Sequence, residues 1–178
     1  GGDGNYYVVD FARIFPPTMP DRDLPGGQLF RLFRQEFVNS YPEPLCADAF
    51  SGFTKWDQNR RSYNRSVREA TEVLIYQTCP NLARRLCWLL LEARESGDIL
   101  RFNLTQTLHR EGINLRYLGK LLDTITGETA HEELGRMYLY TMILARSIKN
   151  ELRSLMRKNL SQKRSLVPPD IKFMIVSY

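Results

Sequence analysis

Residues 60–78 read RRSYNRSVREATEVLIYQT, and this stretch decides the fold class of the chain. Its apolar residues at helical spacing are Val67, Ala70, Leu74 and Ile75. Spacings of three and four positions place side chains on one face of a helix, so one helix is predicted over residues 60–78. Pro80 then fits the first turn of a second helix, where a missing N–H costs little. This second helix is expected to end at Gly97, a residue suited to a left-handed C-cap.

Helical spacing continues on both sides of this stretch. Upstream, residues 28–41 are predicted to form an amphipathic helix. Its apolar side chains are Leu29, Phe30, Phe33 and Phe37. Downstream, helices are expected over residues 104–112, 115–125 and 128–160.

Strands are expected only at the two ends of the chain. Residues 5–15, NYYVVDFARIF, are aromatic and β-branched, and Pro16 and Pro17 end the strand because proline lacks the N–H that a ladder needs. The last residues of VPPDIKFMIVSY have a similar composition. We therefore expect a mainly α fold with a minor β part: a multi-helix single domain over residues 1–178, with a short N-terminal strand and room for a C-terminal strand. Because a strand begins at residue 5, this domain is expected to be an excised part of a larger protein.

The chain is moderately basic. Its 178 residues include 25 lysines and arginines and 20 acidic residues, a formal net charge of +5. This balance allows RNA or an anionic membrane surface as a partner, and it equally fits a soluble protein that is basic for no binding reason. Three cysteines without a C-x-x-C pair favour a reducing compartment. No apolar run is long enough to span a membrane, and no secretory leader is recognised in the sequence.

The sequence lacks the usual motifs of catalysis. Neither a G-x-G-x-x-G after a strand nor a G-x-x-x-x-G-K-[ST] occurs, which argues against a nucleotide site. VDFAR and LHREGIN resemble kinase motifs, but in the wrong chain order and with Glu111 where a kinase has aspartate. The two histidines, His109 and His131, fall on different predicted helices, so no metal site is expected. We expect no cofactor and no catalytic residue.

The predicted last helix carries the most basic segment. Residues 136–164 hold eight lysines and arginines and one acid, Glu151, a net charge of +7. Arg146, Arg153 and Arg157 lie within about 40° of one another around a helix, a stripe suited to a phosphate backbone. The alternative is that this basic side of the helix is simply exposed to water and binds nothing. The candidate nucleic-acid contacts here are Arg146, Lys149, Arg153, Arg157 and Lys158. The residues expected to face the core from the opposite side are Tyr138, Ala145, Ile148, Leu152 and Leu155.

A second basic cluster lies in NRRSYNRSVRE. Arg60, Arg61 and Arg65 are candidate nucleic-acid contacts. Arginines interleaved with aromatic residues, here Tyr63 and the preceding Trp56, can hold a single strand by charge and stacking. The alternative is an exposed helix face with Trp56 anchoring a loop.

The stretch LHREGINLRYLG, residues 108–119, is predicted to be a joint between two helices. Gly112 can take the left-handed conformation that ends the first helix, and Asn114 can cap the second. Gly119 is expected to allow two elements to approach closely, and Glu111 to pair with Arg116. Capping does not explain His109, Arg116 and Tyr117. We expect these three residues to be buried polar anchors, and contacts to a ligand are the alternative. At the start of the first helix, Asn103 and Gln106 have the spacing of a capping box.

Three blocks of the chain resemble the clustered-mitochondria (CLU) domain. They are DGNYYVVDFARIFPPTMPD, LFRLFRQEFVNSYPEPLCADAFSGF and LHREGINLRYLGKL, in this order between Asp3 and Leu121. The family domain has sequence upstream of the strand, so the chain is expected to be the C-terminal part of the domain. The motif residues, structural or ligand-binding, are Tyr7, Asp10, Arg13, Pro16, Pro17, Asp48, Gly52, His109, Gly112, Asn114, Arg116, Tyr117 and Gly119.

The resemblance implies a non-catalytic interaction module of a large cytoplasmic protein, linked to mitochondrial distribution and to messenger-RNA binding. Two alternatives stay open. One is a protein–protein scaffold module, in which the basic faces meet acidic partners and Phe30, Phe33 and Trp56 belong to the core or to an interface. The other is an enzyme domain whose site is completed by upstream sequence. The likeliest contributors to such a site are Asp10, Arg13, His109 and Arg116.

Overall fold

The structure is a computed structural model that describes residues 14–21 and 23–165, with side chains as far as residue 160. Over these residues the fold is mainly α, as predicted, and no strand occurs. Pro17 and Leu32 form an isolated antiparallel bridge. The two predicted strands lie outside the described residues, apart from residues 14 and 15.

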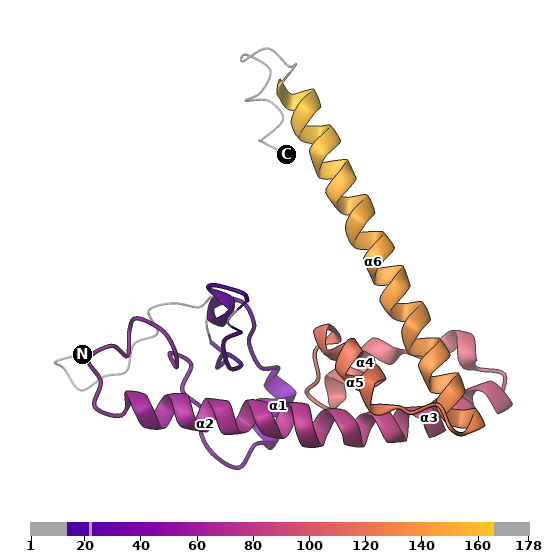
Figure 1. Cartoon of the computed structure of the whole chain (residues 1–178), viewed down its shortest axis with the longest axis horizontal. Coiled ribbons are helices and arrows are strands. Elements are labelled where there is room, and N and C mark those ends of the chain that lie inside the picture. Colours follow the sequence, from indigo (N-terminus) through magenta and orange to yellow (C-terminus); the bar gives the residue numbers. More distant parts are fainter. Residues whose placement is uncertain (1–13, 22, 166–178) are drawn as a thin grey trace. The chain divides into compact units, whose positions relative to one another are not determined.

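Helices follow one another closely from Arg60 onward, whereas the described chain before it is mostly loops and turns (Figure 1). In order they are η2 (Gly27–Leu29), α1 (Gln35–Ser40), α2 (Arg60–Val73), η3 (Leu74–Thr78), α3 (Cys79–Glu95), η4 (Ile99–Arg101), α4 (Leu104–Arg110), η5 (Leu115–Tyr117), α5 (Leu118–Thr124) and α6 (Ala130–Ser165).

The chain divides into two compact units, Gly1–Arg136 and Met137–Tyr178. Helix α6 begins in the first unit and supplies the described part of the second. That residues 1–178 form a single domain therefore stays a prediction.

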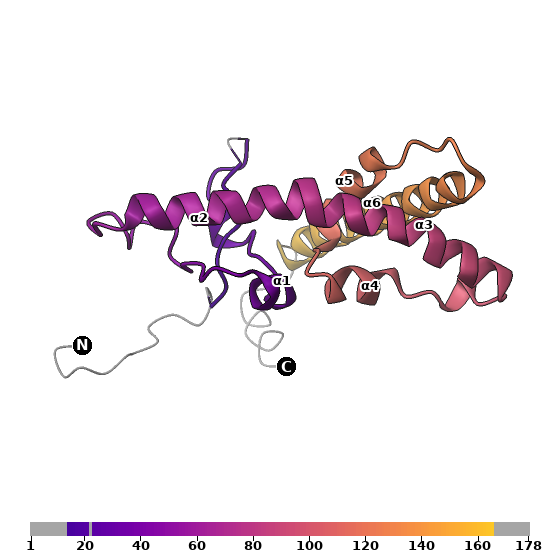
Figure 2. The same cartoon turned by 90° about the horizontal axis from the view of Figure 1, so that it is seen from below.

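Helices α2 and α3 are joined by the π-helical turn η3, so the ribbon runs from one into the other without a break (Figure 2). Pro80 lies in the first turn of α3, as predicted, although the π-helical turn joins α3 directly to α2. In a regular α-helix a proline ring clashes with the carbonyl four residues back. The wider turn before Pro80, in which the N–H of Cys79 bonds to the carbonyl of Leu74, makes room for the ring.

The core of the first unit is built mainly from leucines, with α3 packed against α5. Val67, Ala70 and Leu74 are buried and Ile75 is half-buried, which confirms the predicted inner face of α2 and η3. The other large contributors are Leu82, Leu86, Leu90, Leu104, Leu108, Ile113, Leu118 and Leu121. This core fixes which sides of α2, α4 and α5 remain exposed for binding.

The helix predicted over residues 28–41 is only partly correct. Phe33 and Phe37 are buried and stacked, with ring centroids 4.9 Å apart, but only Gln35–Ser40 is α-helical. Leu29 and Phe30 are exposed. The backbone between these residues and α1 is extended. There the N–H of Thr18 donates to the carbonyl of Arg31 at 2.8 Å, and the N–H of Phe33 donates to the carbonyl of Pro16 at 2.9 Å. This pairing with the preceding segment is favoured over the helix that local propensity predicts.

Candidate functional site

A row of arginines runs along the outer face of α2. Arg61, Arg65 and Arg68 are exposed and follow one another at spacings of four and three, so they lie on one side of the helix. Burial of Val67 and Ala70 turns this side outward. Within the described residues, no carboxylate lies within ion-pair distance of the three guanidinium groups. The arginine row therefore presents positive charge that is not engaged in an ion pair with any carboxylate of the described residues.

Two aromatic side chains stand in the loop just before α2. Trp56 is 87% exposed and Phe53 is 73% exposed. Lys55 Nζ lies 4.9 Å from the centroid of the Trp56 ring. The alternative in which Trp56 anchors the loop is wrong, because the ring makes no core contact that would bury it. Sequence reasoning missed Phe53, although its place in the same polar loop as Trp56 was a usable signal.

A shallow hollow links the loop to the start of α2. It has a volume of about 510 Å³ and is lined by Lys55, Asp57, Gln58, Arg60, Arg61 and Asn64. Asp57 Oδ1 accepts the N–H of Asn59 at 2.7 Å, which holds the loop at the first turn of the helix. Asn64 Oδ1 accepts the N–H of Phe50 at 2.8 Å and ties the earlier part of the loop to α2. The aromatic residues and the arginine row thus lie on neighbouring segments that side-chain hydrogen bonds tie together.

In the second unit, α6 carries the other predicted basic residues. Arg146, Lys149, Arg153, Arg157 and Lys158 are all exposed. The prediction that the opposite side of this helix faces the core is wrong for most of its members. Ala145, Ile148, Leu152 and Leu155 are exposed, and Tyr138 is half-buried. Amphipathic spacing identifies an apolar face but does not say whether anything covers that face.

The joint at residues 108–119 has the predicted caps. Gly112 is left-handed, with φ of 70°, and the side chain of Asn114 accepts the N–H of Arg116 at 3.1 Å. Asn103 accepts the N–H of Gln106 at 3.0 Å at the start of α4. These bonds satisfy backbone donors that a helix start leaves open.

The joint also packs directly on α1. A β-carbon at Gly112 would lie 2.5 Å from the backbone nitrogen of Phe37, so only glycine fits there. Arg116 Nη2 donates to the carbonyl of Leu32 at 2.8 Å. The second and third blocks of the family resemblance are therefore in contact, and Arg116 is an anchor between them.

Two predictions about the joint are wrong. Glu111 pairs with Arg85 of α3 rather than with Arg116. Gly119 is exposed, and a β-carbon there would meet nothing within 4 Å, so it allows no close approach. Gly135 plays that role instead, because a β-carbon there would lie 2.6 Å from Cys87 Sγ.

The remaining polar residues of the joint, His109 and Tyr117, line two different hollows. His109 lines a hollow with Glu36, Asn103, Thr105, Gln106 and Arg110. Burial lowers the pKa of His109, the charge of Arg34 acts in the same direction, and Glu36 opposes both. Hydrogen bonds from Arg34, at 2.8 and 3.0 Å, hold the pKa of Glu36 below its usual range. Tyr117 lines a different hollow with Phe50, Arg68 and Lys120, and the Arg116 guanidinium lies 5.0 Å from its ring centroid.

The other motif residues that the structure describes take part in backbone hydrogen bonds of turns and of the Pro17–Leu32 bridge. The carbonyl of Pro16 accepts the N–H of Phe33 at 2.9 Å, and Pro17 is buried at the bridge with Leu32. The carbonyls of Asp48 and Gly52 accept turn hydrogen bonds from Ser51 and Lys55, both at 3.1 Å. Tyr7, Asp10 and Arg13 lie outside the described residues.

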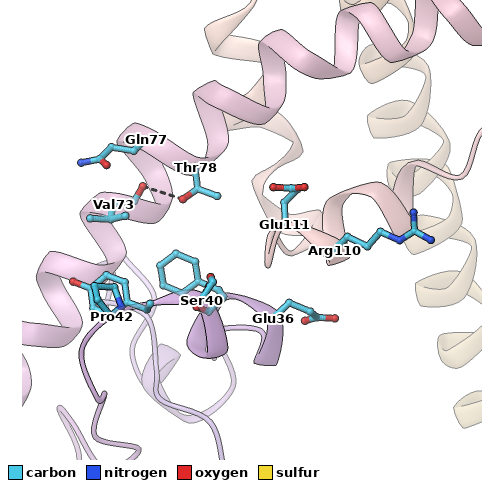
Figure 3. Close-up of a pocket in the computed structure, with 10 residues that line it drawn as sticks. Glu36, Ser40, Pro42, Val73, Gln77, Thr78, Arg110 and Glu111 are labelled. Atoms are coloured by element: carbon cyan, nitrogen blue, oxygen red, sulfur yellow. Dashed lines mark hydrogen bonds between the residues drawn. The ribbon is translucent and has the colours of Figure 1, made fainter.

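A cleft of about 500 Å³ opens between α1, η3 and the joint (Figure 3). Ser40 Oγ donates to the carbonyl of Phe37 at 2.9 Å, and Thr78 Oγ1 donates to that of Val73 at 3.4 Å. Both hydroxyls are thus bonded to backbone carbonyls rather than to a neighbouring base. Within the described residues, no group of three or more metal-ligating side chains comes together. No helix among them is long and apolar enough to cross a membrane.

Comparison with known proteins gives two matches. Residues 102–168 match the family described as "Translation initiation factor eIF3 subunit 135". Over 126 residues the chain is 27% identical to a protein named "Clustered mitochondria protein homolog" from Aspergillus oryzae (strain ATCC 42149 / RIB 40), covering 67% of this chain and 10% of that protein. The chain therefore spans a small part of the curated relative it matches. No solved structure matches it. These similarities support a relationship to the clustered-mitochondria family.

Proposed function

We propose that this chain is a non-catalytic, RNA-binding module of a larger cytoplasmic protein that acts in mitochondrial distribution. The name of the relative from Aspergillus oryzae supports the mitochondrial part. The match of residues 102–168 to a translation initiation factor subunit supports the RNA-binding part of the proposal. The C-terminal position of this chain within the family domain is part of the same proposal.

The observation that carries RNA binding is the pairing of exposed aromatic rings with the arginine row. Arg61, Arg65 and Arg68 have no carboxylate within ion-pair distance among the described residues, and guanidinium groups match phosphate oxygens well. Trp56 offers an exposed face on which an unpaired base can stack. The arginine charges can bind the phosphates of any nucleic acid, whereas stacking on the aromatic rings requires unpaired bases. We therefore expect the α2 surface to prefer single-stranded RNA.

The experiment is fluorescence anisotropy of labelled single-stranded and double-stranded RNA with the whole chain over a range of salt concentrations. Arg61→Glu with Arg65→Glu should lower the affinity roughly tenfold or more and flatten the salt dependence. Trp56→Ala should lower the binding free energy of single-stranded RNA by about 1–3 kcal/mol and change that of double-stranded RNA little. The matched control is Arg84→Glu with Arg94→Glu, two exposed arginines of α3. If the control pair weakens binding as much as the α2 pair, or if RNA does not bind, the proposal is wrong.

The basic row of α6 is the second proposed RNA surface. Arg153→Glu with Arg157→Glu tests it separately, because both side chains are exposed and neither supports the core. We expect loss of RNA binding from this double change. Binding that survives it would restrict the RNA site to α2.

A further inference from the structure

A continuous apolar stripe runs along α6. Leu144, Ile148, Leu152 and Leu155 are 62%, 53%, 54% and 46% exposed. Their spacings of four, four and three keep them within about 80° of one another around the helix. An exposed apolar patch of this length marks a contact surface, because leaving it in water is unfavourable.

The arginines of the same helix lie on its other side. Arg146, Arg153 and Arg157 are about 140–180° away from Ile148, and Lys149 lies at the border between the two faces. Glu151, the one acidic residue from 144 to 160, and Lys158 lie at the edge of the stripe, about 60° and 80° from Ile148. A strongly basic polar face opposite an apolar face is the composition of helices that lie flat in a membrane interface.

Different occupants suit these two faces to different degrees. A second copy would bring two strongly basic helices together, and their charges would repel each other. RNA would use the basic face and leave the apolar stripe in water. An anionic lipid surface takes up the apolar side chains at the boundary of the acyl chains, and its headgroups attract the cations within a Debye length. Only this occupant is complementary to both faces.

We propose that α6 docks lengthwise on an anionic lipid surface through Leu144, Ile148, Leu152 and Leu155. The segment from residue 144 to residue 160 is about 26 Å long, so it lies along the interface. This inference does not depend on RNA binding, because the apolar stripe has no role there, although both proposals use the cations of α6.

The test is flotation of the whole 178-residue chain with vesicles of phosphatidylcholine, with and without phosphatidylserine. We expect binding only to vesicles that contain phosphatidylserine. Ile148→Asp with Leu152→Asp should lower the partitioning roughly tenfold or more, because two apolar side chains no longer enter the interface. Leu29→Asp with Leu100→Asp is the matched control, since both of these leucines are exposed outside α6. Helix content by circular dichroism confirms that the variants are folded.

Three outcomes would overturn the proposal. The first is absence of wild-type binding to phosphatidylserine vesicles. The second is equal binding by the stripe variant and the control. The third is a wild-type chain that dimerises without binding vesicles and that the stripe variant makes monomeric, which assigns the stripe to a second copy. RNA binding, measured on the same stripe variant, should be unchanged, so failure of one proposal is distinguishable from failure of the other.

Discussion

Gly112 and Phe37 are far apart in the sequence, yet a β-carbon at Gly112 would stand 2.5 Å from the nitrogen and the β-carbon of Phe37. The glycine is also left-handed, with φ of 70°. Two independent constraints therefore select glycine at this position: the turn that ends α4 and the closeness of α1. This contact joins the block around α1 to the joint.

Gly112→Ala should be strongly destabilising. A side chain adds the strain of the left-handed conformation and a clash with backbone, together about 2–5 kcal/mol of unfolding free energy. The measurement is urea unfolding followed by circular dichroism. Gly119→Ala is the matched control, and it should leave stability unchanged or raise it by up to about 1 kcal/mol, because its β-carbon meets nothing within 4 Å. Similar losses in both variants would contradict the assigned packing.

Arg116→Ala should lower the unfolding free energy by about 1–3 kcal/mol, because the carbonyl of Leu32 loses the donor that lies 2.8 Å away. The same urea unfolding measures it. Arg110→Ala, at an exposed arginine of the same joint, is the control and should change stability little. An Arg116 variant as stable as wild type would show that the motif arginine is not an anchor.

His109 should make stability depend on pH near neutrality. Burial lowers its pKa below the ordinary 6.5, so between the lowered value and 6.5 the unfolded chain binds more protons than the folded chain. The unfolding free energy therefore rises with pH through this window and levels off above it. His109→Gln should remove the rise, whereas His131→Gln should keep it, as measured by urea unfolding at a series of pH values. The same slope in both variants would refute the role of His109.

Cys79 should resist alkylation in the folded chain. Burial raises the pKa of its thiol to about 12, so almost no thiolate is present at neutral pH. Iodoacetamide labelling followed by mass spectrometry should modify half-buried Cys46 first and Cys79 only after unfolding. Equal labelling rates in the native chain would show that α3 opens readily.

Local features of the chain were predictable because they depend on neighbours in sequence. The inner face of α2, the caps at Asn103 and Asn114 and the left-handed Gly112 follow from spacing and side-chain chemistry. Pro80 lies in the first turn of α3 as expected, but the π turn that joins α2 to α3 was not predictable from local spacing. Arg116 and Glu111 show the same limit for polar residues, since each found a distant partner in place of the other.

The sequence by itself determined that the fold is helical and where its basic and apolar stripes run, because periodicity is a local property. Only the tertiary structure decided which stripes are covered. The leucines of α3 and α5 meet in a core, while Ile148 and Leu152 of α6 remain exposed with equally regular spacing. Burial depends on which elements pack together, and that arrangement is set by contacts between distant residues such as Gly112 and Phe37.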